Sequence, residues 1–374
     1  MKSTLKLGLI AILTAIVISV VLAACASDPE PTATPVPTAT PEPTATPEPT
    51  ATPEPTHTPT PTVVPYPAVQ GIIDPSNRDW PREVELADEV VVIEERPERV
   101  LAYSLGHDEI LIALIDPERF AAVGPFAADP AYSNVADQAA GLPTFESGVE
   151  NVLAAKPDLV LASKYTDVDV INLIKEAGVP VARTALESSS EGNIPNILLI
   201  GYMLGVEERA LELVAEIENR LKFVTDQVPP LNDAQRPAVI AVSRYSDSIY
   251  AAGSDTTEGG IVEAGGGINA SARDGLEGHQ VISIESIAAM NPDVILITQP
   301  VAYGANEFRD DLLNHPALAD VSAISENELH VVDGRLYTTL SHWNVRGIEE
   351  TARLLYPEEF SEVTFEDFEP YSGE

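Results

Sequence analysis

The amino-acid sequence predicts an α/β fold made of two lobes with parallel sheets, joined by a single long helix. A thirteen-residue pattern occurs twice, beginning at Val149 and at Ile284. Each copy has a short amphipathic helix, a Pro-Asp break and an apolar run suited to a strand buried on both faces. Two such copies indicate two lobes of similar build. Pro-Asp is also a common joint between helices and strands, but a glutamate seven residues before it in both copies, Glu150 and Glu285, favours a repeat.

The first 67 residues do not fit a globular fold. Residues 1–24 contain a basic start and a long apolar stretch, and they end in small residues before Cys25, the only cysteine. This pattern predicts a lipoprotein signal peptide with lipidation of Cys25, the alternative being an uncleaved membrane anchor. Residues 25–67 repeat Thr-Ala-Thr-Pro-Glu-Pro, which predicts an extended stalk of polyproline II type.

The charge of the chain excludes several classes of partner. Twenty-one Lys and Arg stand against 59 Asp and Glu, a formal net charge of −38. Such acidity argues against binding to nucleic acid and to anionic lipid surfaces. Solubility, including solubility in a saline habitat, explains it more simply than cation collection does.

Alternating strands and helices follow the stalk in each lobe. The N-terminal lobe is expected at 68–204, with strands at 90–93, 100–103, 121–124, 159–162 and 179–181 and helices from 104 and at 168–177. Residues 205–229 keep an apolar helical period up to Pro229-Pro230, which predicts the connecting helix. The C-terminal lobe is expected at 230–374, with strands at 238–242, 294–297 and 329–332 and helices at 260–264, 308–314 and 345–355.

Candidate binding residues follow from one rule: ligands of open α/β folds bind beyond the carboxyl ends of the strands. The rule selects Tyr103, Ser104, His107, Lys164, Tyr165, Arg244, Tyr245, Gln299, Tyr303, His342, Trp343 and Arg346. Aromatic side chains together with Lys164, Arg244 and Arg346 would suit a large anionic chelate. Structural alternatives remain open, because His107 is also a helix-start residue, Trp343 also fits a packing role, and Arg346 stands three and four residues before two glutamates.

Taken together, the lipobox, the repeated Glu…Pro-Asp pattern and the long helix resemble the substrate-binding lipoproteins of ABC importers. The branch is the Fe/B12 periplasmic-binding domain family, class III, and the similarity spans residues 88–356. Three further stretches, 97–104, 250–254 and 265–270, are also similar to this family.

The resemblance implies two Rossmann-like lobes with a ligand cleft between them and an iron-siderophore chelate as ligand, with cobalamin, haem or a bare metal ion as alternatives. It also implies that Glu150 and Glu285 dock on arginines of a dimeric membrane permease. A monomer without an intrinsic cofactor is expected.

Two other classes of function, an exported enzyme and a structural lipoprotein, are alternatives to a binding protein. An exported enzyme would need a catalytic motif, and the sequence contains no Gly-x-Ser-x-Gly, His-Glu-x-x-His, Cys-x-x-Cys or Walker lysine. Six dispersed histidines lack the close spacing of a metal site. We therefore expect no catalytic residues and no metal centre. A surface-anchored structural or adhesive lipoprotein is the other alternative, since the stalk would serve it equally well.

Overall fold

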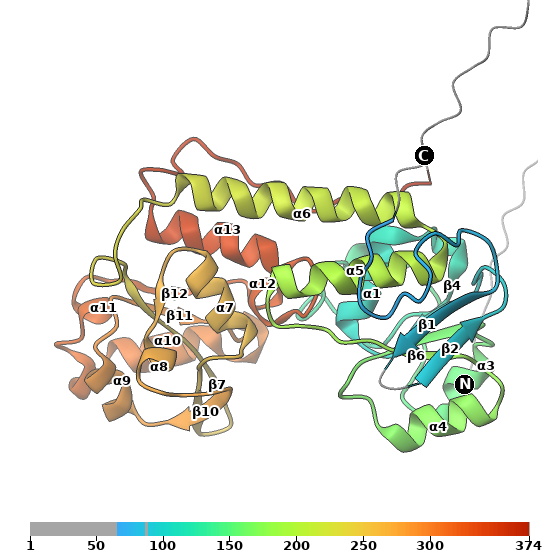
Figure 1. Cartoon of the computed structure of the whole chain (residues 1–374). Coiled ribbons are helices and arrows are strands. Elements are labelled where there is room, and N and C mark those ends of the chain that lie inside the picture. The colour runs from blue at the N-terminus through green and yellow to red at the C-terminus, as the bar shows by residue number, and fades with distance from the viewer. Residues whose placement is uncertain (1–65, 87–88, 374) are drawn as a thin grey trace, which may run out of the picture. The chain divides into compact units, whose positions relative to one another are not determined.

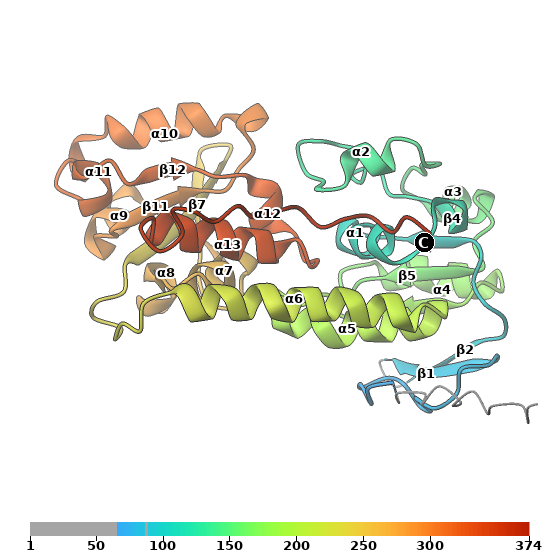
Figure 2. The same cartoon turned by 90° about the horizontal axis from the view of Figure 1, so that it is seen from above.

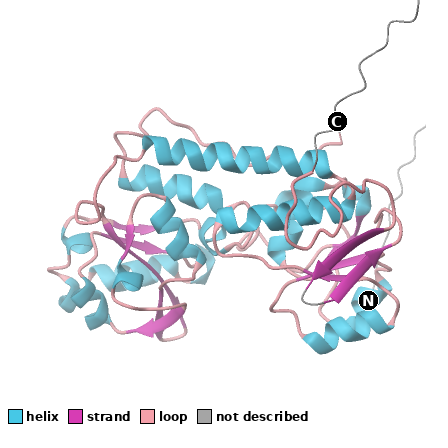
Figure 3. Ribbon diagram, in the orientation of Figure 1, coloured by secondary structure: helices cyan, strands magenta, loops and turns pink. Residues whose placement is uncertain are grey.

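A computed structural model describes residues 66–86 and 89–373, and residues 62–374 form one compact unit. The predicted signal peptide, Cys25 and most of the stalk lie outside the described residues. We find no helix in the described part of the chain with the length and apolarity that a membrane crossing requires. Figure 3 shows helices packed around separate groups of strands.

The N-terminal lobe contains a four-stranded parallel sheet in the order β4-β3-β5-β6. All four residues of β5 are buried, as the apolar run predicted for a strand covered on both faces. The strands are β3 (Val100–Ala102), β4 (Phe120–Ala122), β5 (Leu159–Ala162) and β6 (Val181–Arg183). The helices are α1 (Leu105–Leu114), η1 (Pro117–Arg119), α2 (Ala136–Ala139), α3 (Val149–Ala154) and α4 (Val168–Glu176).

The predicted strand at 90–93 exists but does not belong to this sheet. It is β2 (Glu89–Ile93), which forms an antiparallel pair with β1 (Arg82–Leu86). Alternate residues of β2 are buried, so its inward face packs on the lobe while Val90 and Val92 stay exposed.

One long helix connects the lobes, as the sequence predicted. The expected long helix is α6 (Glu207–Gln227), and α5 (Ser190–Leu204) precedes it. Gly205 ends α5 in the left-handed region at a φ of 65°, which lets the chain turn back into α6. Figures 1 and 2 show α5 and α6 side by side, with α13 (Asn344–Leu355) alongside α6.

The C-terminal lobe contains a mixed sheet, which differs from the all-parallel sheet expected from the sequence. Its strand order is β10-β8-β7-β11-β12, with β9 pairing β7. β7 pairs in parallel with β11 and antiparallel with β8, because a two-residue turn at 246–247 makes a hairpin. The strands are β7 (Ala238–Tyr245), β8 (Ser248–Ala252), β9 (Ile268–Asn269), β10 (His279–Ile282), β11 (Val294–Ile297) and β12 (Leu329–Val331).

Short helices cover this second sheet. The predicted segments at 260–264, 308–314 and 345–355 are all helical within a few residues. The helices before α13 are α7 (Thr257–Ala264), α8 (Ala270–Arg273), α9 (Ile284–Met290), η2 (Val301–Tyr303), α10 (Ala305–Leu313), η3 (Pro316–Leu318), α11 (Ser322–Ser325) and α12 (Gly334–Thr338).

The tail after α13 contacts the N-terminal lobe. Tyr371 donates its backbone N–H to Ile112 in α1, and Arg209 donates to the carbonyl of Glu369. Figure 2 shows this tail extending from the end of α13 toward the elements of the N-terminal lobe.

The repeated pattern has the same structural role in both lobes. The Asp158 carboxylate accepts the backbone N–H of Arg99 at 2.9 Å, just before β3. The Asp293 carboxylate accepts the N–H of Ala238 at 2.8 Å, at the start of β7. In each lobe the aspartate N–H returns a bond to the carbonyl of the same residue. The Pro-Asp unit therefore fixes where a central strand begins.

We predict that Asp158→Ala and Asp293→Ala each lower the free energy of unfolding by about 1 to 2 kcal/mol, because each loses a charge-assisted bond to a strand terminus. Urea denaturation followed by circular dichroism measures the change. Asp226→Ala, which removes an exposed ion pair with Lys222 on α6, is the control and should cost at most about 0.5 kcal/mol. Equal effects in all three variants would contradict a shared role of the repeat.

Candidate functional site

Carboxyl ends of β3 and β5 meet a segment of the C-terminal lobe around one cavity of about 420 Å³. The N-terminal lobe contributes Tyr103 and Ser104 after β3, and Tyr165 after β5. Thr338, Thr339 and Leu340 provide the opposite wall. Three of the residues selected from the sequence therefore line one cavity that residues of both lobes enclose.

Tyr103 is held in place by its own lobe. Its hydroxyl accepts the backbone N–H of Gly148 at 3.2 Å, and its ring packs against Phe145 with centroids 5.6 Å apart. Tyr165, in contrast, is 74% exposed. A large exposed aromatic ring beside a cavity is a surface that a ligand can cover.

His107 lies behind the cavity rather than in it. The side chain is fully buried, with Nδ1 2.8 Å from Ser104 Oγ and Nε2 2.7 Å from Thr184 Oγ1. Burial lowers the pKa of His107 to about 3, so the ring is neutral at physiological pH. Both nitrogens are engaged, which supports the interpretation of His107 as a structural helix-start residue.

The C-terminal lobe contributes exposed tyrosines. Tyr245 at the end of β7 is 56% exposed and Tyr303 in η2 is 53% exposed. Gln299 is buried and holds the backbone next to both tyrosines. Its side-chain amide accepts the N–H of Arg244 at 2.5 Å and donates to the Tyr303 carbonyl at 2.9 Å. Burial, followed by the charge of Glu258, raises the pKa of Tyr245.

Two aromatic residues that the sequence did not single out extend this surface from the other lobe. Tyr132 has its ring 5.5 Å from that of Tyr303, and a hydrogen bond to Tyr303 raises the pKa of Tyr132. Phe126 is 56% exposed and meets the Tyr132 ring edge-on. They lie in a loop between β4 and α2, where no strand-end rule applies, and the aromatic content of residues 126–132 was the available signal.

Two of the selected basic residues are already neutralised. Arg244 is 2.6 Å from Asp311 and stacks on Phe308. Arg346 pairs with Glu349, Glu350 and Asp367, and the two pairs within its helix confirm the alternative that the sequence offered. Lys164 is exposed and its ammonium lies 5.4 Å from the centre of the Tyr165 ring.

His342 and Trp343 are packing residues in this structure. They are 1% and 4% exposed, and both rings contact Phe368 of the tail. Burial lowers the pKa of His342 to about 3, and the charges of Arg209 and Arg220 act in the same direction.

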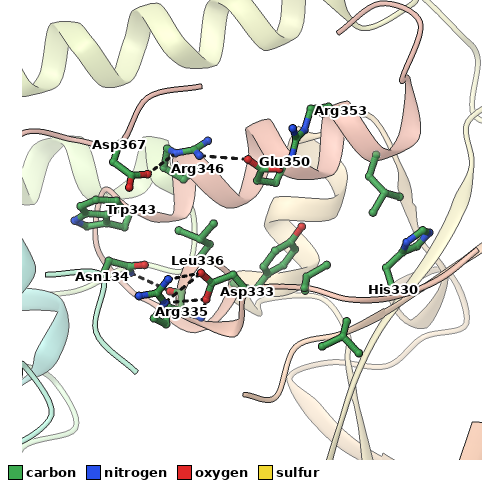
Figure 4. A pocket seen from close by; sticks show the side chains of 14 residues that line it. Asn134, His330, Asp333, Arg335, Leu336, Trp343, Arg346, Glu350, Arg353 and Asp367 are labelled. Carbon is green, nitrogen blue, oxygen red and sulfur yellow. Dashed lines mark hydrogen bonds and ion pairs between the residues drawn. The ribbon is translucent and has the colours of Figure 1, made fainter. Parts of the chain in front are cut away.

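A second cavity of about 590 Å³ lies beside this packed cluster (Figure 4). Arg335, Arg346 and Arg353 reach it from α12 and α13, but each is paired with a carboxylate that also lines the cavity. Its charges are therefore satisfied within the protein.

Glu150 and Glu285 occupy equivalent positions in the first turns of α3 and α9, and both are exposed. Hydrogen bonds from its own backbone N–H and from Ser283 lower the pKa of Glu285. Figure 1 shows both helices on the side of their lobe that faces away from α6.

Within residues 66–86 and 89–373, no three His, Cys, Asp or Glu side chains are grouped to hold a metal ion. The described site instead has the form of a ligand-binding cleft: aromatic side chains and hydroxyl groups from two lobes enclose a cavity at the ends of parallel strands. These features define a two-lobed binding protein.

Comparison with known proteins places the chain within that class. A family model described as periplasmic binding protein matches residues 100–336, and the chain belongs to this family. Substrate-binding proteins of this family bind small molecules and work with a membrane ABC permease. They are transport proteins rather than enzymes.

Individual relatives agree with this assignment. The chain is 28% identical over 295 residues to an uncharacterized ABC transporter substrate-binding lipoprotein, YvrC, of Bacillus subtilis, covering 78% of this chain and 87% of that protein. It is 25% identical over 277 residues to the cobalamin-binding protein of Halobacterium salinarum, covering 73% and 72%. The periplasmic heme-binding protein RhuT of Roseiflexus shares the fold, with a TM-score of 0.61, 24% identity and coverage of 70% and 99%.

The two buried histidines should make stability depend on pH. Their pKa values in the unfolded chain are about 6.5, so below that pH the unfolded chain binds protons that the folded chain excludes down to about pH 3. Their stabilising contribution is therefore complete above about pH 6.5 and is lost as the pH falls toward 3.

We predict that lowering the pH from 6.5 to 5 reduces the free energy of unfolding by about 1.5 kcal/mol for each of the two histidines. His342→Leu should remove one such contribution, as measured by urea denaturation at both pH values. Trp343→Phe, in the same cluster but without a titrating group, should leave the pH dependence unchanged. A His342→Leu protein with the pH dependence of the wild type would show that the ring is not excluded from protonation.

Proposed function

We propose that this protein captures a large metal chelate with extended apolar faces and little negative charge, a corrinoid in the first place, and delivers it to an ABC permease. The observation that carries the proposal is the set of exposed aromatic residues that the two lobes present, one of which lines the cavity. Tyr165 lines the cavity with its ring exposed, and Tyr245 and Tyr303 are exposed on the C-terminal lobe, where the Tyr303 ring lies 5.5 Å from that of Tyr132 of the N-terminal lobe. Rings of this kind bind flat or bulky organic ligands through burial and stacking.

Charge favours a corrinoid over a strongly anionic chelate. Arg244 and Arg346 were candidates to bind an anion, but both are occupied by carboxylates of the protein. The chain carries a net charge of −38, so an approaching anion is repelled over the whole molecule. The similarity to the cobalamin-binding protein of Halobacterium salinarum supports the same class of ligand.

A ferric siderophore, the ligand first expected from the sequence, is the second candidate. Lys164 favours it, because this exposed ammonium next to Tyr165 has no carboxylate within ion-pair distance in the described structure. One free cation suits a weakly charged hydroxamate complex better than a highly charged catecholate complex.

We predict that the purified protein binds cyanocobalamin with a Kd of about 1 µM or less, measured by isothermal titration calorimetry. Tyr165→Ala should weaken binding by about tenfold, because it removes an aromatic contact of about 1.4 kcal/mol. Phe223→Ala, which removes a partly exposed ring on α6, is the control and should keep the wild-type affinity.

The same titration with ferric hydroxamate, ferric citrate and haemin discriminates the alternatives. Saturable binding of a ferric hydroxamate without cyanocobalamin binding would select the siderophore hypothesis. Flat titrations for every chelate would contradict the proposed ligand class.

We further propose that lipidated Cys25 holds the protein on the outer face of the membrane and that Glu150 and Glu285 dock on permease arginines. Equivalent exposed carboxylates in equivalent helices give one anion per lobe, which suits a partner with two similar halves. The predicted signal and the stalk at 25–67 support the anchoring.

Uptake of labelled ligand by cells tests docking and anchoring together. Glu150→Lys with Glu285→Lys should reduce uptake by about tenfold or more with unchanged ligand affinity, because charge reversal opposes cationic partners. Cys25→Ala should release the protein from the membrane fraction. Glu358→Lys with Glu362→Lys, two exposed carboxylates after α13, changes the charge by the same amount and should transport normally. Normal uptake by the double variant would refute the docking role.

A further inference from the structure

The segment from Thr338 to Asn344 belongs in sequence to the C-terminal lobe, but the N-terminal lobe holds it at several points. Asn193 of α5 donates to the carbonyl of Leu340 at 3.3 Å, and Ser190 donates to the side chain of Asn344 at 2.5 Å. Gly106 in α1 also approaches closely, since a Cβ there would lie 3.3 Å from the Leu340 carbonyl oxygen. The backbone of this segment is thus fixed against α1 and α5.

Glu109 is the charged residue at the centre of this contact. It lies in the second turn of α1 and is fully buried. The hydroxyls of Thr339 and Ser341 both donate to its Oε2, the latter at 2.5 Å. Its Oε1 accepts the backbone N–H and the side-chain amide of Asn134, at 3.0 and 2.9 Å. Four donors from outside α1 therefore converge on one carboxylate.

The carboxylate joins three parts of the chain. Asn134, in the loop between β4 and α2, also donates to the carbonyl of Arg335 in α12 at 3.1 Å. Thr339 and Leu340 line the ligand cavity that Tyr103 and Tyr165 line from the other side. Any displacement of the joint at Glu109 would therefore move one wall of the cavity relative to the other.

We propose that Glu109 is a positioning residue for ligand binding: its carboxylate fixes Thr339 and Ser341, and through them the wall that the C-terminal lobe presents to the ligand. This rests on the proposed function, since the cavity is taken as the ligand site. Glu109 does not reach the ligand itself; it acts through the hydroxyls that it orients.

The donor arrangement explains why a carboxylate is needed. Hydroxyls occupy one oxygen and amide N–H groups occupy the other, so both oxygens of the carboxylate accept and together hold all four groups. A glutamine has one accepting oxygen and one donating nitrogen. With its oxygen toward the two N–H groups of Asn134, its NH2 group faces the two hydroxyls, which must then reverse and accept, so neither hydroxyl is held by an acceptor any longer and the negative charge that strengthens all four bonds is lost.

Hydrogen–deuterium exchange and calorimetry on the full-length protein test the proposal together. Glu109→Gln should speed amide exchange in residues 338–344 by about tenfold without ligand, and should weaken cyanocobalamin binding by a similar factor, since each tenfold change reflects about 1.4 kcal/mol. Exchange in β11, which forms no hydrogen bond with Glu109 or with residues 338–344 in the described structure, should stay at the wild-type rate.

Asp108→Asn is the matched control. Asp108 is the adjacent buried carboxyl group, but it accepts the N–H of Gly124 within its own lobe. Asp108→Asn should leave the ligand affinity unchanged. Exchange in 338–344 should change no more than the global free energy of unfolding does. Ser341→Ala and Thr339→Val, which remove donors on the other lobe, should reproduce the effect of Glu109→Gln and serve if that variant does not fold.

Unchanged local exchange in Glu109→Gln, or an equal effect in Asp108→Asn, would overturn the positioning role. If the wild type binds none of the chelates, the proposed function fails. The exchange rates of the ligand-free variants still decide whether Glu109 fixes the segment.

Discussion

Polar contacts to the segment Thr338–Asn344 hold the two lobes in register, and the ligand cavity depends on them. Hydrogen bonds are directional, whereas an apolar contact allows two surfaces to slide. A buried carboxylate in such a joint is expensive to desolvate, and only a full set of donors offsets that cost. Glu109 has this full set. The joint therefore favours one relative placement of the cavity walls, which lowers the ordering cost of binding a ligand.

The C-terminal tail also helps to fix the relative placement of the two lobes, through contacts with α6 and α1. Arg220 of α6 stacks on Phe368 and donates to the carbonyls of Glu366 and Asp367. Tyr371 then bonds to α1, so the chain returns to the lobe in which it began. With α6 and this tail linking the lobes, and α5 bonded to Leu340 and Asn344, large hinge motions are disfavoured.

Sequence periodicity predicted the elements that local patterns define and missed those that tertiary packing defines. The repeats gave β5 and β11 because four apolar residues after Pro-Asp suit a central strand. Helix α5 was missed, since Gly192, Pro195 and Gly201 interrupt its sequence. Packing explains Gly201: a Cβ there would lie 2.3 Å from that of Ala210, so the close contact of α5 with α6 requires glycine. Hairpin β7–β8 was missed because its turn residues, Ser246 and Asp247, carry no glycine.

The strand-end rule located the cleft but could not give the direction of each side chain. Tyr103 and Tyr165 follow strands directly, and both line the cavity. His107 lies within α1, where its place on the helix turns it toward Thr184 and away from the cavity. His342 and Trp343 lack a preceding strand that would fix them, and the tail covers both. No local pattern could have indicated that a segment 25 residues away in sequence, around Phe368, would bury them.

The excess of acidic residues affects which ligands could bind, because it leaves few arginines and lysines without a carboxylate partner. A net charge of −38 leaves few basic residues to spare, and the two candidate arginines, Arg244 and Arg346, are bound to carboxylates. In such pairs the aliphatic and planar parts of arginine still contribute packing, as Arg244 does on Phe308. The cavity thus offers rings and hydroxyl groups to a ligand, and most of the charge of the chain lies on carboxylates elsewhere. Under the proposed function, the net negative charge would disfavour anionic chelates before they reach the cavity, since charge repulsion acts at longer range than any contact within it.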